Sequence, residues 1–95
     1  MSDIKSYEDV YNYHGWREQN KQFIGEAYEL AEAIHDYQDD KSLRNWNHVT
    51  EEVADILFMI NQVIAEYKIA DENIDAWLSY KRKRESKRIE EGYYE

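Results

Sequence analysis

The chain has 95 residues with no cysteine, no proline, three glycines and a formal net charge of −9 at pH 7. The lack of cysteine excludes disulfides, thiolate metal sites and a thiol nucleophile, and the acidic balance disfavours general binding to nucleic acid. The length suits one domain over residues 1–95, and no apolar run approaches the ~20 residues that span a bilayer. Since no apolar signal core is present at the N-terminus, we expect a cytoplasmic protein that does not associate with membranes.

The apolar residues recur at helical spacing in the N-terminal half. Ser6 and Asp9 resemble a capping box ahead of a short helix over residues 7–13. Gly15 separates this helix from a longer one over about 16–37. The long helix carries a wide apolar stripe, which predicts that it packs against a neighbour.

The C-terminal half predicts two further helices. The polar stretch 39–46 is expected to be a loop, and Asn47 is the expected N-cap of a helix over about 48–67. Asp71 is the expected N-cap of a last helix over about 72–91. Four helices joined by short loops predict an all-α fold, an antiparallel four-helix bundle. So short a chain is expected to complete this bundle by oligomerisation.

The third predicted helix is apolar nearly all round from Val53 to Ile60, with Asp55 as its one charged residue. Such a helix lies at the centre of a bundle or at a subunit interface, so we expect Asp55 to be buried. A buried carboxylate without a partner is costly and tends to take up a proton. Either a Lys or Arg from another helix or a metal ion is therefore expected to neutralise it.

Asp55 belongs to one of two carboxylate pairs with the same spacing. Glu26 and Glu29 share a helix face, as do Glu52 and Asp55, and none of the four has a Lys or Arg three or four residues away. The first pair alone is typical of a solvated acidic face. Two converging pairs instead suit a hard, oxygen-preferring cation such as Mg²⁺ or Mn²⁺.

These two motifs, Glu26-Ala27-Tyr28-Glu29 and Glu52-Val53-Ala54-Asp55, resemble the ExxE and ExxD motifs of MazG-like, all-α nucleoside triphosphate pyrophosphohydrolases. The resemblance extends from about Trp16 to Arg88. It implies hydrolysis of (deoxy)nucleoside triphosphates between the α and β phosphates, which gives a nucleoside monophosphate and pyrophosphate in nucleotide house-cleaning. It also implies a homodimer or homotetramer and a Mg²⁺ ion, for which Mn²⁺ is a possible substitute. The implied metal ligands are Glu26, Glu29, Glu52 and Asp55.

The catalytic residues follow from the same resemblance. With no Cys nucleophile and no Ser-His-Asp arrangement, attack by water with the help of the metal is the simplest chemistry. Glu29 and Glu52 are equal candidates for the general base. His48 lies one turn before Glu52 and is expected to pair with it.

Substrate contacts are expected from basic and aromatic residues. Lys81, Arg84 and Arg88 are spaced by three and four on one helix face, and the resemblance assigns them to the phosphates. Lys41 and Arg44, in the predicted loop, are expected to reach the same ligand. For all five, ordinary surface charge is the alternative.

Recognition of the base is assigned to two residues. Trp46 is the preferred stacking residue, and Asn61 is a candidate for hydrogen bonding to the base or ribose. An anchor in the core or an interface is the alternative for Trp46, and a polar subunit contact is the alternative for Asn61.

Two other functions compete with the enzyme. The first is a non-catalytic helical interaction or regulatory module that dimerises through its apolar helix. Such a module would not be stabilised by Mg²⁺, whereas a site that binds metal only in the folded state would be. The second is a nucleic-acid-binding helix at 81–88, which the acidic remainder disfavours.

Overall fold

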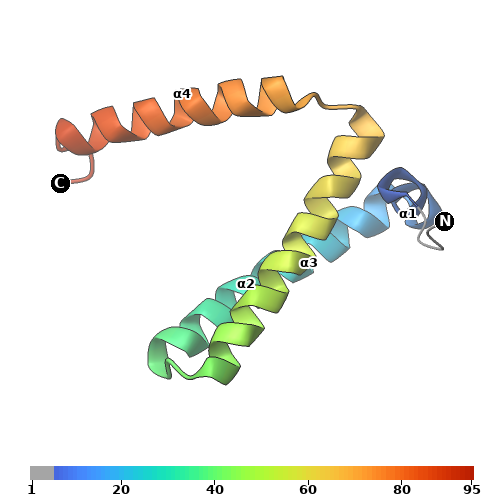
Figure 1. The fold of residues 1–95 in the computed structure, drawn as a ribbon, viewed down its shortest axis with the longest axis horizontal. Helices are drawn as coiled ribbons and strands as arrows, with labels where there is room; N and C mark the ends of the chain where they lie inside the picture. Colours follow the sequence, from blue (N-terminus) through green and yellow to red (C-terminus); the bar gives the residue numbers. More distant parts are fainter. Residues whose placement is uncertain (1–5) are drawn as a thin grey trace.

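The computed structural model describes residues 6–95 and confirms the predicted all-α class. The described residues contain no strand and form α1 (Tyr7–His14), α2 (Trp16–Asp39), α3 (Leu43–Tyr67) and α4 (Asp71–Glu90). Helices α2 and α3 form an antiparallel hairpin, and α1 packs against both of them near the N-terminal end of α2 (Figure 1). None of the described helices combines the length and apolar character needed to cross a membrane.

The predicted boundaries in the N-terminal half are confirmed. The Oγ atom of Ser6 accepts a hydrogen bond from the backbone N–H of Asp9 at 3.2 Å and so caps α1. Gly15 has φ +86°, in the left-handed region where glycine carries no steric penalty. This residue therefore allows the turn that separates α1 from α2.

The predicted loop over 39–46 is present but shorter, because α2 ends at Asp39 and α3 already begins at Leu43. Ser42, rather than Asn47, is the N-cap, and its Oγ accepts from the backbone N–H of Asn45 at 3.2 Å. A serine at the N-cap accepts a hydrogen bond from a backbone N–H of the first turn, which would otherwise have no partner in the helix. The helix is thereby extended over a polar stretch that lacks an apolar stripe.

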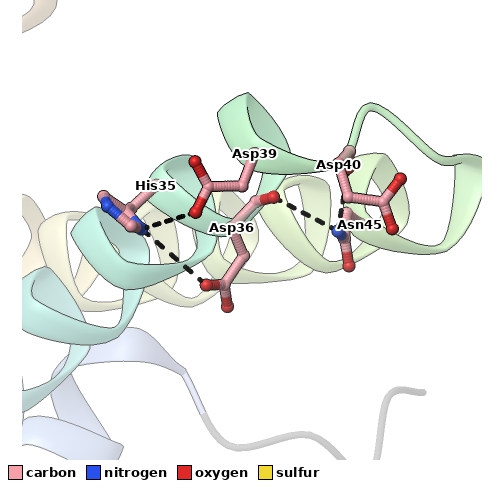
Figure 2. Close-up of polar contacts among 5 residues, drawn as sticks. All are labelled: His35, Asp36, Asp39, Asp40 and Asn45. Carbon is pink, nitrogen blue, oxygen red and sulfur yellow. Dashed lines mark hydrogen bonds and ion pairs between the residues drawn. The ribbon is translucent and has the colours of Figure 1, made fainter.

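Asn45, in the first turn of α3, also forms hydrogen bonds with the end of α2. Its Nδ2 donates to the backbone oxygens of Asp36, at 3.3 Å, and Asp40, at 2.9 Å. Figure 2 shows this link beside His35, whose Nδ1 lies 3.7 Å from the carboxylate of Asp39. These bonds satisfy carbonyl groups at the end of α2, so the connection is short and well defined.

Few side chains are buried in the described part of the chain. The buried apolar residues are Tyr11, Ala33 and Met59. Three polar residues are also buried: Gln19, Glu52 and Gln62. The amide Nε2 of Gln19 donates to Oε1 of Gln62, which joins α2 to α3 across this small core. Half of the buried residues are therefore polar. Four of the six lie where α1, α2 and α3 meet, and Ala33 and Glu52 lie further along the hairpin.

The last turn of α3 directs α4 away from the hairpin. Lys68 has φ +53°, in the left-handed region, and the N–H of Ile69 donates to the carbonyl of Ile64 at 3.0 Å. A left-handed residue followed by this hydrogen bond is a common way to end an α-helix. Helix α4 then begins at Asp71, which is its first residue and not the N-cap that the sequence predicts. Ala70 occupies the cap without a side-chain hydrogen bond.

Within one chain, α4 packs on no other described helix, so the four helices do not close into the predicted bundle. Figure 1 shows α4 extending from the far end of α3. The radius of gyration is 16.9 Å, whereas a compact domain of this length has about 12.4 Å. The expectation that a single chain needs a partner to complete the bundle stays a prediction.

Candidate metal centre

Helices α2 and α3 bring three of the four predicted carboxylates together. Glu26 comes from α2, and Glu52 and Asp55 come from α3. One carboxylate oxygen from each of these three residues lies within 4.8 Å of the other two. We call Glu26, Glu52 and Asp55 the carboxylate cluster. The equal spacing of the two sequence motifs is what allows them to face each other across the hairpin.

The buried member of the cluster is Glu52, and the expected burial of Asp55 is wrong. Glu52 is 5% exposed, whereas Asp55 is more exposed and lines a cavity. The reason is that none of the described helices covers the outer side of α3, where Val53 and Leu57 are 41% and 51% exposed. The apolar residues around Asp55 therefore did not identify the most buried carboxylate of the cluster, which is Glu52.

Two carboxylate oxygens in the cluster are buried without a hydrogen-bond donor. They are Oε2 of Glu26 and Oε2 of Glu52. A buried carboxylate oxygen without a donor costs the full desolvation of that group. Either a proton or a cation satisfies such an atom, so the oxygens fit a metal with oxygen ligands.

The surroundings of Glu52 resist its ionisation. Burial raises the pKa of the Glu52 carboxyl, and the negative charges of Glu29 and Asp55 raise it further. His48 acts in the opposite direction: its Nε2 lies 3.4 Å from Oε1 of Glu52, which confirms the predicted pairing. The contact occupies Oε1 and leaves Oε2 without a partner.

Glu26 has a similar environment. Burial raises the pKa of its carboxyl, the hydrogen bond from Gln22 Nε2 at 2.6 Å lowers it, and Asp55 and Glu29 raise it. A positive charge at the cluster would relieve this repulsion between like charges. The electrostatics therefore favour a cation at this point of the hairpin.

Glu29, the fourth predicted ligand, lies at the edge of the cluster. It is exposed and is not among the three residues whose oxygens converge. Its charge nevertheless raises the pKa of both Glu26 and Glu52, so it is close enough to act on ions held there.

A cavity of about 250 Å³ adjoins the carboxylate cluster between α1, α2 and α3. Glu26 and Asp55 form one part of its wall, and Gln19, Gln62 and Phe58 form another. Sequence reasoning did not assign this cavity. Its signal was the presence of amide side chains on otherwise apolar inner faces, which places hydrogen-bonding groups in a core.

The predicted substrate residues near the hairpin turn line hollows other than the cavity beside the cluster. Lys41 and Trp46 line a hollow at the turn, and Arg44 lines another that contains Asp36. Along α3, Trp46 lies six positions before Glu52, about 9 Å of helix, and Arg44 lies eight positions before it, about 12 Å. None of these three residues lines the cavity that adjoins the carboxylate cluster.

Asn61 lies closer to the cluster, on the same helix as Asp55. Its Nδ2 donates to the hydroxyl of Tyr7 at 3.4 Å, and the Tyr7 ring meets Phe58 edge-on at 5.6 Å between centroids. The structure thus places Asn61 in a contact between α1 and α3, behind the Phe58 wall of the cavity.

The three predicted phosphate ligands on α4 lie away from the cluster of their own chain. Each instead lies near an aromatic ring on its own segment. Lys81 is 5.9 Å from the ring centroid of Trp77, Arg84 is 5.5 Å from that of Tyr80 and Arg88 is 5.0 Å from that of Tyr93. Lys81 and Arg84 are exposed, whereas Arg88 is half-buried.

An all-α fold with converging carboxylates from two helices defines a class of acidic helical sites suited to a divalent cation. The family model of the MazG nucleotide pyrophosphohydrolase domain matches residues 18–81. The chain therefore belongs to this family, as its motifs predict, and its family implies a nucleotide substrate. No curated protein and no solved structure matches the chain significantly.

Proposed function

We propose that this protein hydrolyses nucleoside triphosphates between the α and β phosphates, in a reaction that depends on Mg²⁺. The products are a nucleoside monophosphate and pyrophosphate. The observation that carries the proposal is the pair of buried, unpartnered oxygens of Glu26 and Glu52, beside Asp55 and a cavity. Membership of the MazG family supports the same reaction.

Glu26, Glu52 and Asp55 would hold the Mg²⁺ ion, or Mn²⁺ in its place, and Glu29 is proposed as a further ligand or as the base. A bound Mg²⁺ supplies positive charge that screens the phosphate oxygens and acidifies water. His48 keeps Oε1 of Glu52 in place, which leaves Oε2 for the ion. The donors are all oxygens, in agreement with a hard cation.

Glu29 is our choice for the general base. It is exposed at the edge of the cluster, so it can accept a proton from water and release it to solvent. Glu52, the other candidate, is buried, and His48 and the cluster surround both of its oxygens. Its position suits a ligand better than a group that exchanges protons at each turnover.

The cavity beside the cluster is proposed to hold the nucleoside. The side chains of Gln19 and Gln22 offer amide groups, and Phe58 offers a ring face for stacking. In this arrangement the phosphates lie toward Glu26 and Asp55, with the base toward α1. Trp46 and Asn61 remain the alternative assignment for the base.

The direct test is a panel of ribo- and deoxyribonucleoside triphosphates with Mg²⁺, with pyrophosphate release as the readout. We expect pyrophosphate from at least one triphosphate and none after chelation of the metal. A wild-type protein that binds no Mg²⁺ and releases no pyrophosphate from any nucleotide would contradict the proposal. It would favour a non-catalytic helical module instead.

A further inference from the structure

A second group of metal-binding side chains lies on α3, beside the carboxylate cluster. His48, Glu51 and Glu52 are spaced by three and four residues, so they share one face of the helix. One ligand atom of each residue lies within 4.8 Å of the other two. We call these three residues the histidine group. It shares Glu52 with the carboxylate cluster, whereas His48 and Glu51 lie outside both sequence motifs.

The donor atoms of the histidine group differ in kind from those of the carboxylate cluster. The cluster offers only carboxylate oxygens, which suit Mg²⁺. The histidine group adds an imidazole nitrogen, a ligand typical of Zn²⁺ and other transition-metal ions and not of Mg²⁺. The two groups on one hairpin therefore favour different ions.

The spacing of His48 and Glu52 suits a tetrahedral ion. Nε2 of His48 lies 3.4 Å from Oε1 of Glu52. Two ligands with bonds of about 2.0–2.1 Å to a tetrahedral Zn²⁺ lie about 3.3 Å apart. Neighbouring ligands of an octahedral Mg²⁺ lie closer, about 2.9 Å apart. A tetrahedral ion can therefore join the two atoms with little movement of either side chain.

Glu52 is the buried donor of the group, and no Lys or Arg neutralises it. The residue is 5% exposed, and its Oε2 has no hydrogen-bond partner. Within residues 6–95, no ion pair joins Glu51 or Glu52 to a Lys or Arg. The nearest Lys or Arg along α3 is Arg44, which lines a separate hollow with Asp36. The buried carboxylate therefore has His48 as its one partner among the described ion pairs.

An ordinary ion pair between protonated His48 and Glu52 is the alternative. On a helix, the more stable order places the acidic residue four positions before the basic one, and here the order is reversed. The group also holds two carboxylates, those of Glu51 and Glu52. A divalent ion neutralises both of their charges, whereas one proton on His48 neutralises a single charge. The composition of the group therefore favours an ion over a proton.

We infer that His48, Glu51 and Glu52 form a second metal site, which takes Zn²⁺ or a similar transition-metal ion in preference to Mg²⁺. Water completes the coordination, because His48 and Glu51 are exposed to solvent. Oε1 of Glu52, beside His48, serves this ion, and Oε2 remains for the carboxylate cluster. The inference concerns metal binding alone and does not depend on the proposed reaction.

Binding is tested with Co²⁺, a coloured substitute for Zn²⁺, on the full chain without a polyhistidine tag. The wild type is expected to develop the strong visible absorption of tetrahedral Co²⁺ and to lose it when Zn²⁺ is added. His48→Ala should weaken Co²⁺ binding by at least ~10–100-fold, which is the typical loss even for an outer-shell partner of a ligand. Glu52→Gln should have the same effect.

Nitrogen NMR of the histidine rings gives a second readout. The chain has three histidines, so their ring signals can be assigned by substituting each in turn. Zn²⁺ should shift the Nε2 signal of His48 and leave those of His14 and His35 in place, because a bound metal changes the electronic environment of its own ligand nitrogen.

Two variants are matched controls. His35→Ala removes a histidine that also lies beside carboxylates, with its Nδ1 3.7 Å from Oδ2 of Asp39, but those carboxylates are exposed. Glu26→Gln removes a member of the carboxylate cluster that does not belong to the histidine group. Both variants should retain the absorption of tetrahedral Co²⁺.

The outcomes decide for or against the second site. A wild type without tetrahedral absorption, or His48→Ala with wild-type affinity for Co²⁺, would overturn the inference. Equal losses in Glu26→Gln and His48→Ala would place the ion in the carboxylate cluster, which would also overturn it, as would a loss in His35→Ala. If the Co²⁺ results are as expected but no triphosphate yields pyrophosphate, the second site stands and the proposed reaction fails.

Discussion

Helices α2, α3 and α4 have similar lengths, of 24, 25 and 20 residues, yet only α2 and α3 pack on other described helices of the chain. The hairpin holds the small core and gathers Glu26, Glu52 and Asp55. Helix α4 packs on none of the other described helices and leaves Trp77, Lys81 and Arg84 exposed. The comparison separates a region that is proposed to carry the chemistry from a region that packs on no other described helix of its chain.

The largest expected effect is on the hairpin. Asp55→Asn keeps the size of the side chain but removes a charge from the cluster, so pyrophosphate release should fall more than ~100-fold. Asp75→Asn makes the same change on exposed α4 and should retain wild-type turnover. Circular dichroism should show equal helix content in both variants. Normal turnover by Asp55→Asn would remove the distinction between the two regions.

A comparable effect is expected for the proposed base. Glu29→Gln should lower kcat by about 10²–10⁴ with little change in Mg²⁺ affinity, since a general base acts on the reaction and not on binding. Glu32→Gln, also exposed on α2, is the control. If Glu29→Gln instead weakens Mg²⁺ binding and leaves kcat at saturating metal unchanged, Glu29 is a ligand and Glu52 becomes the candidate base.

Most of the hairpin could be predicted from the sequence because its determinants are local. The Ser6 cap, the turn at Gly15 and the end of α3 at Tyr67 follow from capping residues and apolar spacing. The start of α3 was missed, because its cap, Ser42, precedes a polar stretch that gives no periodic apolar signal.

The sequence predicted which residue types form the candidate site, but not which of its carboxylates is buried. The repeated spacing of the carboxylates indicated that two helices face each other, but the apolar run around Asp55 placed the burial at the wrong residue. Periodicity reports which face is apolar, and cannot tell whether a core or a second chain covers it. The same ambiguity explains why a closed bundle was expected from a chain whose α4 stands apart.

Metal binding should stabilise the hairpin measurably. With free Mg²⁺ at 100 times its dissociation constant, linkage predicts about 2.7 kcal/mol, a rise in Tm of roughly 10–20 °C for a domain of this size. Glu26→Gln should remove most of this rise, whereas Glu72→Gln at the start of α4 should retain it. A Tm that does not respond to Mg²⁺ in the wild type would leave the buried oxygens of Glu26 and Glu52 without their proposed partner.

The smallest effect is the pH dependence of the metal-free protein. The pKa of Glu26 and of Glu52 is raised in the folded state, so the folded chain holds protons that the unfolded chain releases. The resulting stability is fully present below the unfolded pKa of about 4.3 and is lost as the pH rises through the folded values. Urea denaturation at a series of pH values should therefore show wild-type stability falling relative to Glu52→Gln as the pH rises.

Saturating Mg²⁺ should reverse this trend, because the ion binds the ionised carboxylates and competes with their protons. Glu32→Gln, on the exposed side of α2, should follow the wild type at every pH. A pH profile of Glu52→Gln that coincides with that of the wild type would mean that Glu52 ionises in the fold as easily as in the unfolded chain. The burial of Glu52 would then give no electrostatic reason to expect a cation at the hairpin.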